Sequence, residues 1–152
     1  MSGAVPSLGN AQHVRVFGSD IYYMPAIKPG AGVSIIQQII PPHDGPPLHL
    51  HRHEDVILRV IQGEHRVRIG QNDVKAVPGD TLFLPRGIPH TYVNCGERKS
   101  HVIFIVQPGG LERYFVELAD ALQIDPTQEP KIRAKYGVEC IGPNPFIVAP
   151  SD

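Results

Sequence analysis

The chain has 152 residues, of which 41% are hydrophobic and 19% are charged, and its formal net charge at pH 7 is -1. This length suits one domain that buries its own core without disulfides, and the two cysteines form no paired motif. The near-neutral charge argues against nucleic acid or anionic lipid as a partner, and no stretch approaches the roughly 18 apolar residues that cross a bilayer. We therefore expect a cytoplasmic protein whose partner is a small molecule.

Short runs rich in β-branched residues alternate with turn signals through the first two thirds of the chain. The 16 prolines and 15 glycines interrupt the sequence too often for long helices there. Runs of this length between turns are typical of the strands of a sandwich or barrel. The predicted strands are Val14–Phe17, Ile21–Met24, Val33–Ile40, Val56–Ile61, His65–Ile69, Val74–Val77, Thr81–Leu84, Thr91–Val93 and Val102–Val106.

The last third of the chain has a helical pattern. Apolar residues recur at helical spacing between Gly110 and Gln123, which predicts an amphipathic helix on the core. A second short helix is predicted from Pro130 to Gly137, because proline suits the first turn of a helix. The Pro-rich tail from residue 142 onward is expected to be extended. The apolar stripe of the first helix consists of Leu111, Tyr114, Phe115 and Leu118. We interpret it as a surface that packs against other parts of the protein rather than as a substrate lid.

Three histidines stand at spacings that can bring them together. His49 and His51 share one face of an extended strand. His90 follows a turn signal and opens another strand, so a closed sheet can place it opposite the first pair. Three imidazoles can hold Fe, Zn, Ni, Mn or Cu and leave coordination positions free. We predict one divalent metal ion at these residues; the alternative is an exposed histidine pair and a buried turn histidine.

The segments around these histidines resemble the cupin superfamily. The family motif G-x5-H-x-H-x(3,4)-E-x6-G is matched at His49, His51 and Gly63, with three residues rather than five between Gly45 and His49. The second motif, G-x5-P-x-G-x2-H-x3-N, is matched in full, at Gly79, Pro85, Gly87, His90 and Asn94.

The resemblance covers residues 33–107, and residues 108–115 are similar to the tail of small single-domain cupins of the quercetin dioxygenase-like and polyketide-tailoring kinds. It implies an all-β double-stranded β-helix, a jelly-roll-like barrel, with one or two short C-terminal helices. One cupin domain is expected over residues 1–152, with a core barrel at about 14–107 and a helical segment and tail at 108–152. The resemblance also implies a homodimer that pairs through an edge strand.

The chain departs from the family pattern at the metal-binding glutamate, whose usual position is occupied by Val56. Asp55 fits the shorter motif spacing only if the inward parity of the strand moves by one residue, so we do not expect it to be a ligand. Glu54 is not expected to face inward, and His53 is expected on the surface. A site of three histidines carries the full charge of its ion, which favours an anionic bidentate substrate such as an enolate, a catecholate or a β-diketonate.

The missing glutamate is also the family's expected proton acceptor. Substitutes would come from neighbouring strands: Gln37 or Gln38, one of which must face inward, and Tyr92, which shares a face with His90. His101 is a further candidate near the site. Each of these residue types more often packs or forms hydrogen bonds than catalyses, so both interpretations stay open.

Alternation outward from the histidines predicts an apolar pocket. With no inward Lys or Arg expected, a flat hydrophobic ligand is favoured over a sugar phosphate or nucleotide sugar. The candidate residues for contact with the substrate are Val56, Leu58, Phe83 and Phe104; the other residues expected to face inward are Val33, Ile35, Val60, Tyr92 and Val106.

These observations favour a metal-dependent cupin enzyme that acts on a small phenolic, enolic or polyketide-like substrate, with an oxidoreductase of the dioxygenase type as the leading hypothesis. Two alternatives remain open. One is a non-oxidative cyclase, dehydratase or isomerase in which the ion is only a Lewis acid. The other is a non-catalytic ligand-binding cupin, in which Val56 marks a degenerate metal site.

Overall fold

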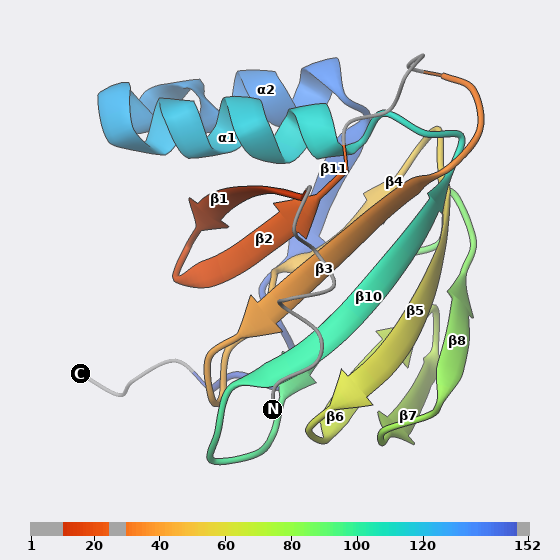
Figure 1. Cartoon of the computed structure of the whole chain (residues 1–152). Helices are drawn as coiled ribbons and strands as arrows, with labels where there is room; N and C mark the ends of the chain where they lie inside the picture. Colours follow the sequence, from red (N-terminus) through yellow and green to blue (C-terminus); the bar gives the residue numbers. More distant parts are fainter. Residues whose placement is uncertain (1–10, 25–29, 149–152) are drawn as a thin grey trace.

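The chain folds into two antiparallel β-sheets, with two helices packed at one end (Figure 1). The computed structural model describes residues 11–24 and 30–148. The six-stranded sheet has the order β1-β2-β3-β10-β5-β8 and the five-stranded sheet the order β11-β4-β9-β6-β7. The strands are β1 Gln12–Val16, β2 Ser19–Tyr23, β3 Ser34–Ile40, β4 Leu48–His51, β5 Asp55–Gln62, β6 His65–Ile69, β7 Asn72–Ala76, β8 Thr81–Leu84, β9 His90–Asn94, β10 Ser100–Gln107 and β11 Val138–Gly142; the helices are α1 Glu112–Ile124, the short 3-10 helix η2 Pro126–Gln128 and α2 Glu129–Lys135.

The core lies between the two sheets and is built by alternation along their strands. In β5, Val56, Leu58 and Val60 are each at most 3% exposed, while the residues between them face outward. Val67 of β6 meets them from the other sheet and is fully buried. Apolar area removed from water in this way is the main stabilising term of such a fold.

The predicted all-β double-stranded β-helix with two C-terminal helices is confirmed. Each of the nine predicted strands is present, and the segment of His49 and His51 is extended as expected. Strand β11 was not predicted, because its sequence follows directly on the second helix and is only five residues long. It pairs with β4 and so forms the edge of the sheet that carries two of the histidines.

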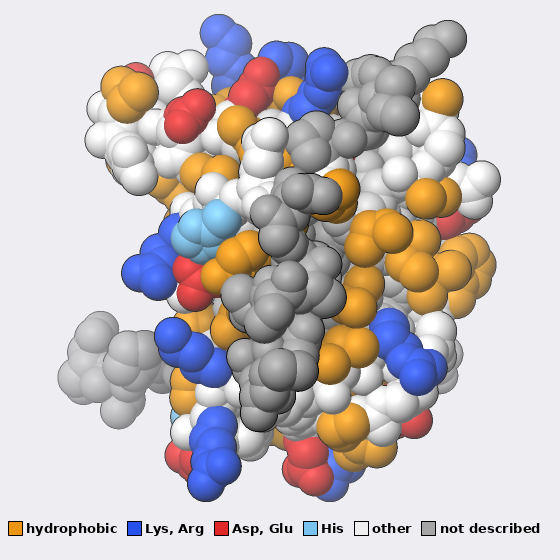
Figure 2. All heavy atoms as spheres, in the orientation of Figure 1, with side chains coloured by type: hydrophobic (Ala, Val, Ile, Leu, Met, Phe, Trp, Pro, Cys, Tyr) orange, Lys and Arg blue, Asp and Glu red, His pale blue; other side chains and the backbone are white. Residues whose placement is uncertain are grey.

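Three residues expected to face inward lie on the outer face of the six-stranded sheet, so these predictions are wrong. Phe83 is 55% exposed because β8 buries Leu84 instead, and β3 likewise buries Ser34 and Ile36, which turns Val33 and Ile35 outward. Strand register aligns Ile35, Ile105, Ile57 and Phe83 across β3, β10, β5 and β8. We call these four side chains the outer apolar row, and Figure 2 shows hydrophobic side chains gathered over these strands.

Helix α1 is anchored by a buried polar contact at its first turn. Ser34 Oγ donates to the carboxylate of Glu112, which is 2% exposed, and the Gly110 amide donates to the same hydroxyl at 2.7 Å. A buried carboxylate is stable only when it is hydrogen-bonded in this way, so the pair fixes where α1 crosses the barrel end. Within the described ranges, no helix is both long and apolar enough to cross a membrane.

Candidate metal centre

The structure brings His49, His51 and His90 together, as predicted from their spacing. His49 lies directly opposite His90 in the pairing of β4 with β9, and His51 follows on the same face of β4. One ligand nitrogen from each ring lies within 4.8 Å of the others, and the ring centroids are separated by 4.5, 5.1 and 5.4 Å. Three nitrogens this close together are spaced as the ligands of a single metal ion could be.

Backbone carbonyls determine which nitrogen of two rings is free. His49 Nδ1 donates to the Pro47 carbonyl at 2.7 Å, and His90 Nδ1 donates to the Ile88 carbonyl at 3.3 Å. A carbonyl only accepts hydrogen bonds, so in the neutral ring the proton is on Nδ1 and the lone pair is on Nε2. This is the usual tautomer of metal-binding histidines whose other nitrogen is held by an acceptor.

His51 faces a carboxylate that we did not expect near the site. His51 Nδ1 and Glu54 Oε1 are both buried without a hydrogen-bond partner among the described residues, and they lie 3.9 Å apart. Burial raises the pKa of Glu54. Val56, by contrast, is directed inward as predicted, and Asp55 faces away and accepts hydrogen bonds from Arg86 at 2.9 and 3.1 Å. The carboxylate of Glu54 thus lies near Nδ1 of His51 and is not part of the cluster of ligand atoms that the three histidines form.

Burial keeps the three imidazoles uncharged at neutral pH. It lowers the pKa of His90 to about 3, with a further contribution from the neighbouring His49. The pKa of His51 lies well below its ordinary value for the same reasons, and burial also lowers that of His49. Neutral rings are the ligand state that a divalent ion requires, and the Nε2 lone pairs of His49 and His90 are free to bind one. The residues present therefore fit a metal ion.

The loop before β4 is held tightly against β9. A Cβ atom at Gly45 would lie 2.0 Å from the Tyr92 carbonyl oxygen, so only glycine permits this approach. Thr91 Oγ1 donates to the Pro46 carbonyl at 2.7 Å, and Asn144 Nδ2 donates to the same carbonyl at 2.8 Å. Asn144 lies in the C-terminal tail, and its contacts with this loop were not predicted. These contacts position His49 before any ion binds.

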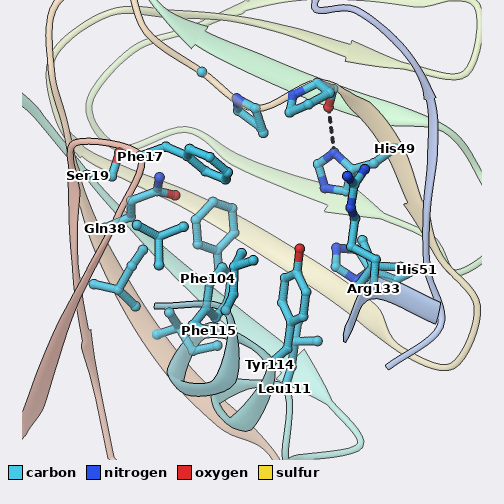
Figure 3. Close-up of a pocket in the computed structure, with 18 of the residues that line it drawn as sticks. Phe17, Ser19, Gln38, His49, His51, Phe104, Leu111, Tyr114, Phe115 and Arg133 are labelled. Atoms are coloured by element: carbon cyan, nitrogen blue, oxygen red, sulfur yellow. Dashed lines mark hydrogen bonds between the residues drawn. The ribbon is translucent and has the colours of Figure 1, made fainter. Parts of the chain in front are cut away.

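The histidines line a cavity of about 270 Å³ whose walls are mostly apolar (Figure 3). Val56 and Phe104 line it as predicted. Leu58 is buried in the core but is not among the lining residues, because it lies further along β5 from the histidines. Phe83 is on the outer face of the sheet and has no part in this cavity.

Of the predicted polar residues, Gln38 and Tyr92 reach the cavity and Gln37 does not. The Tyr92 hydroxyl donates to Gln38 Oε1 at 2.6 Å, and burial raises the pKa of Tyr92 far above its ordinary value. This leaves the Gln38 amide hydrogens as donors inside the cavity. Gln37 instead accepts a hydrogen bond from His101 Nε2, and neither residue lines the cavity.

The two helices supply cavity residues that sequence reasoning missed. The stripe of α1 packs on the core as expected, but its four residues also line the cavity, so it has both roles. Tyr114 directs its hydroxyl into the cavity toward His51 and Arg133 (Figure 3). Arg133 and Glu129 reach the cavity from α2, so the expectation of no inward arginine is wrong. Arg133 reaches the cavity because α2 lies over the end of the barrel, and no pattern in the sequence predicts where α2 packs.

The comparisons with known proteins point to one family. Residues 36–106 match the family described as the cupin domain. KdgF from Halomonas sp. aligns with a TM-score of 0.59 and 22% identity over 67% of this chain and 90% of that one. An RmlC-like cupin from Shewanella frigidimarina aligns with a TM-score of 0.57 and 17% identity over 66% of this chain and 86% of that one.

A sugar phosphate isomerase of a cupin superfamily from Silicibacter pomeroyi is also similar, with a TM-score of 0.52 and 18% identity over 59% of each chain. At these identities the likeness shows the fold alone. No curated protein is significantly similar to this chain in sequence.

Proposed function

We propose that the chain is a cupin and that it is a metal-dependent enzyme acting on a small phenolic, enolic or polyketide-like molecule, with an oxygenase-type reaction as the leading chemistry. One observation carries this proposal: three neutral imidazoles, two of which have a free Nε2 lone pair, line a mostly apolar cavity. Histidines whose role is only structural have no reason to gather around one point and leave their lone pairs unused.

The chain's own residues would bind and orient the substrate. His49, His51 and His90 would hold the ion. A divalent ion there would polarise an enolate or phenolate oxygen as a Lewis acid, and a redox-active ion would also allow electrons to pass from the bound substrate to dioxygen. Val56 and Phe104 offer apolar walls for a flat ligand and exclude water from it.

The polar groups of the cavity would interact with the substrate's oxygens. Gln38 has amide hydrogens to offer to a carbonyl, since its own oxygen is occupied by Tyr92. The Tyr114 hydroxyl has no hydrogen-bond partner among the described residues, and burial raises its pKa to about 12 while the charge of Arg133 opposes that rise. Tyr114 is therefore protonated at neutral pH and would donate to an oxyanion rather than act as a base.

A second candidate function is a non-oxidative proton-transfer reaction such as cyclisation, dehydration or isomerisation. The same Tyr114 phenol favours it, because a protonated donor beside the candidate metal centre suits enol chemistry without an oxidant. Oxygen use separates this candidate from the leading one.

The test uses 1-phenyl-1,3-butanedione as an enolisable probe with protein loaded separately with Fe, Mn, Ni, Cu or Zn. Oxygen consumption and the enolate absorption band are recorded for the wild type, for His90→Ala and for His53→Ala, a surface histidine control. Oxygen consumption that disappears in His90→Ala and persists in His53→Ala supports the oxygenase. An enolate shift with no oxygen uptake, reduced in Tyr114→Phe, supports the second candidate. No probe response with any ion would overturn both.

A further inference from the structure

Arg133 is a half-buried cation, and one of its buried N–H donors has no partner among the residues that the structure describes. It lies on α2, lines the cavity of the histidines, and its side chain is 23% exposed. Its Nη2 contacts Glu129 at 2.8 Å, but its Nε is buried with no partner within the described residues. A guanidinium has five N–H donors, and a buried donor without a partner costs free energy. The ion pair with Glu129 on the same helix leaves this cost in place.

We propose that Arg133 is a subsite for a carboxylate of the substrate, so that the enzyme acts on an acid that carries a second oxygen for the metal centre. The inference rests on the proposed function, because it names the substrate class for that same cavity. Arg133 and the three histidines lie around one cavity, and Figure 3 shows Arg133 beside His49 and His51.

A carboxylate matches this cation better than other anions do. Its two oxygens fit the planar edge of a guanidinium, which binds carboxylates through two parallel hydrogen bonds. A phosphate dianion would lie close to the Glu129 carboxylate, which already contacts the same guanidinium, and the repulsion would oppose it. The surrounding apolar walls, including Phe115 and Leu118 of α1, suit a hydrophobic acid.

Two groups that line the cavity thus select two oxygen-bearing groups of the substrate. The metal centre selects an enolic or phenolic oxygen, and Arg133 selects the acid group. The Tyr114 hydroxyl is directed toward the region of His51 and Arg133 and can donate to either group. The substrate class is therefore a small, mostly apolar carboxylic acid with an enol or phenol.

The test compares 3-phenylpropanoate with its neutral isostere, 3-phenylpropanamide, by calorimetric titration of protein freed of metal with a chelator. Without metal, the carboxylate cannot bind to an ion, so the subsite is measured alone. The variants are Arg133→Gln, Arg133→Lys and Lys131→Gln, the last being an exposed residue of the same helix that undergoes the same change of charge. Thermal unfolding confirms that each variant is folded.

We expect the wild type and Lys131→Gln to bind the acid at least about tenfold more tightly than the amide. Arg133→Gln should remove this preference, and Arg133→Lys should keep only part of it, since lysine lacks the planar edge. Equal binding of acid and amide by the wild type, survival of the preference in Arg133→Gln, or no binding of either probe at millimolar concentration would overturn the proposal. Metal loading of the same samples is scored separately, so failure of the metal centre and failure of the acid subsite are distinguishable.

Discussion

Val56→Glu restores a carboxylate at the position where the family places its metal-binding glutamate, and it tests whether Val56 faces a metal. Val56 is 3% exposed and lines the cavity of the histidines. The ordinary pKa of a glutamate is about 4.3, and in an apolar site its carboxyl must stay protonated at pH 7, about 2.7 pH units higher. Each pH unit costs about 1.4 kcal/mol, so the free energy of keeping the carboxyl protonated is about 4 kcal/mol. In metal-free protein we expect Val56→Glu to lower the free energy of unfolding by this amount.

Val60→Glu is the matched control, because Val60 lies on the same face of β5, is 1% exposed, and does not line the cavity. It should be destabilised to the same degree without metal. Saturating metal, at about a thousand times its dissociation constant, stabilises a protein by about 4 kcal/mol. On metal binding, Val56→Glu should gain this amount, about 4 kcal/mol, and should also recover most of the stability that the substitution removed, because its carboxyl can ionise as a metal ligand. Val60→Glu should gain no more than the wild type.

Urea unfolding with and without the ion measures these changes. If either variant is unfolded without metal, recovery of a cooperative transition on adding metal is the readout. An equal response of Val56→Glu and Val60→Glu to metal would refute the placement of Val56 beside an ion.

Three further predictions concern other parts of the fold. Burial lowers the pKa of His65 to about 4 from 6.5, so the unfolded chain gains a proton between pH 7 and pH 5 that the folded chain does not. Over this range the free energy of unfolding should fall by about 2 kcal/mol more in the wild type than in His65→Gln. Equal decreases of the two proteins in urea unfolding would contradict this. Gly45→Ala places a Cβ 2.0 Å from a carbonyl of β9 and should lower stability by more than about 2 kcal/mol, whereas Gly142→Ala, with open space around its Cβ, should change the melting temperature little. The homodimer implied by the cupin resemblance could pair through the outer apolar row. In that case light scattering should find monomers for Phe83→Glu and dimers for Ile124→Glu, a change at an exposed position of α1. A monomeric wild type would refute the dimer.

The sequence was sufficient for the features that depend on local period and motif spacing. His49 and His51 share a face because strand side chains alternate, and the full second motif placed His90 at the start of a strand. The same alternation correctly turned Val56 inward. These inferences hold because the geometry of a strand fixes which residues share a face.

Features that depend on packing between distant segments could not be predicted. In β8 three apolar residues follow one another, from Leu82 to Leu84, so the pattern did not reveal that Phe83 faces outward. Glu54 reaches His51 through the shape of the connection between β4 and β5, which motif counting does not describe. Tyr114 and Arg133 reach the cavity only because both helices lie over the barrel end. The clustering of the three histidines was therefore predictable, and the residues of the two helices that line the cavity were not.

The most direct test of the proposed metal centre is the metal content of the protein purified without chelators, compared with the double variant His49→Ala/His90→Ala. Elemental analysis should find one divalent ion for each wild-type chain and none in the variant, because two of three ligands are lost. The same metal content in both proteins would show that the ion binds elsewhere and would contradict the assignment.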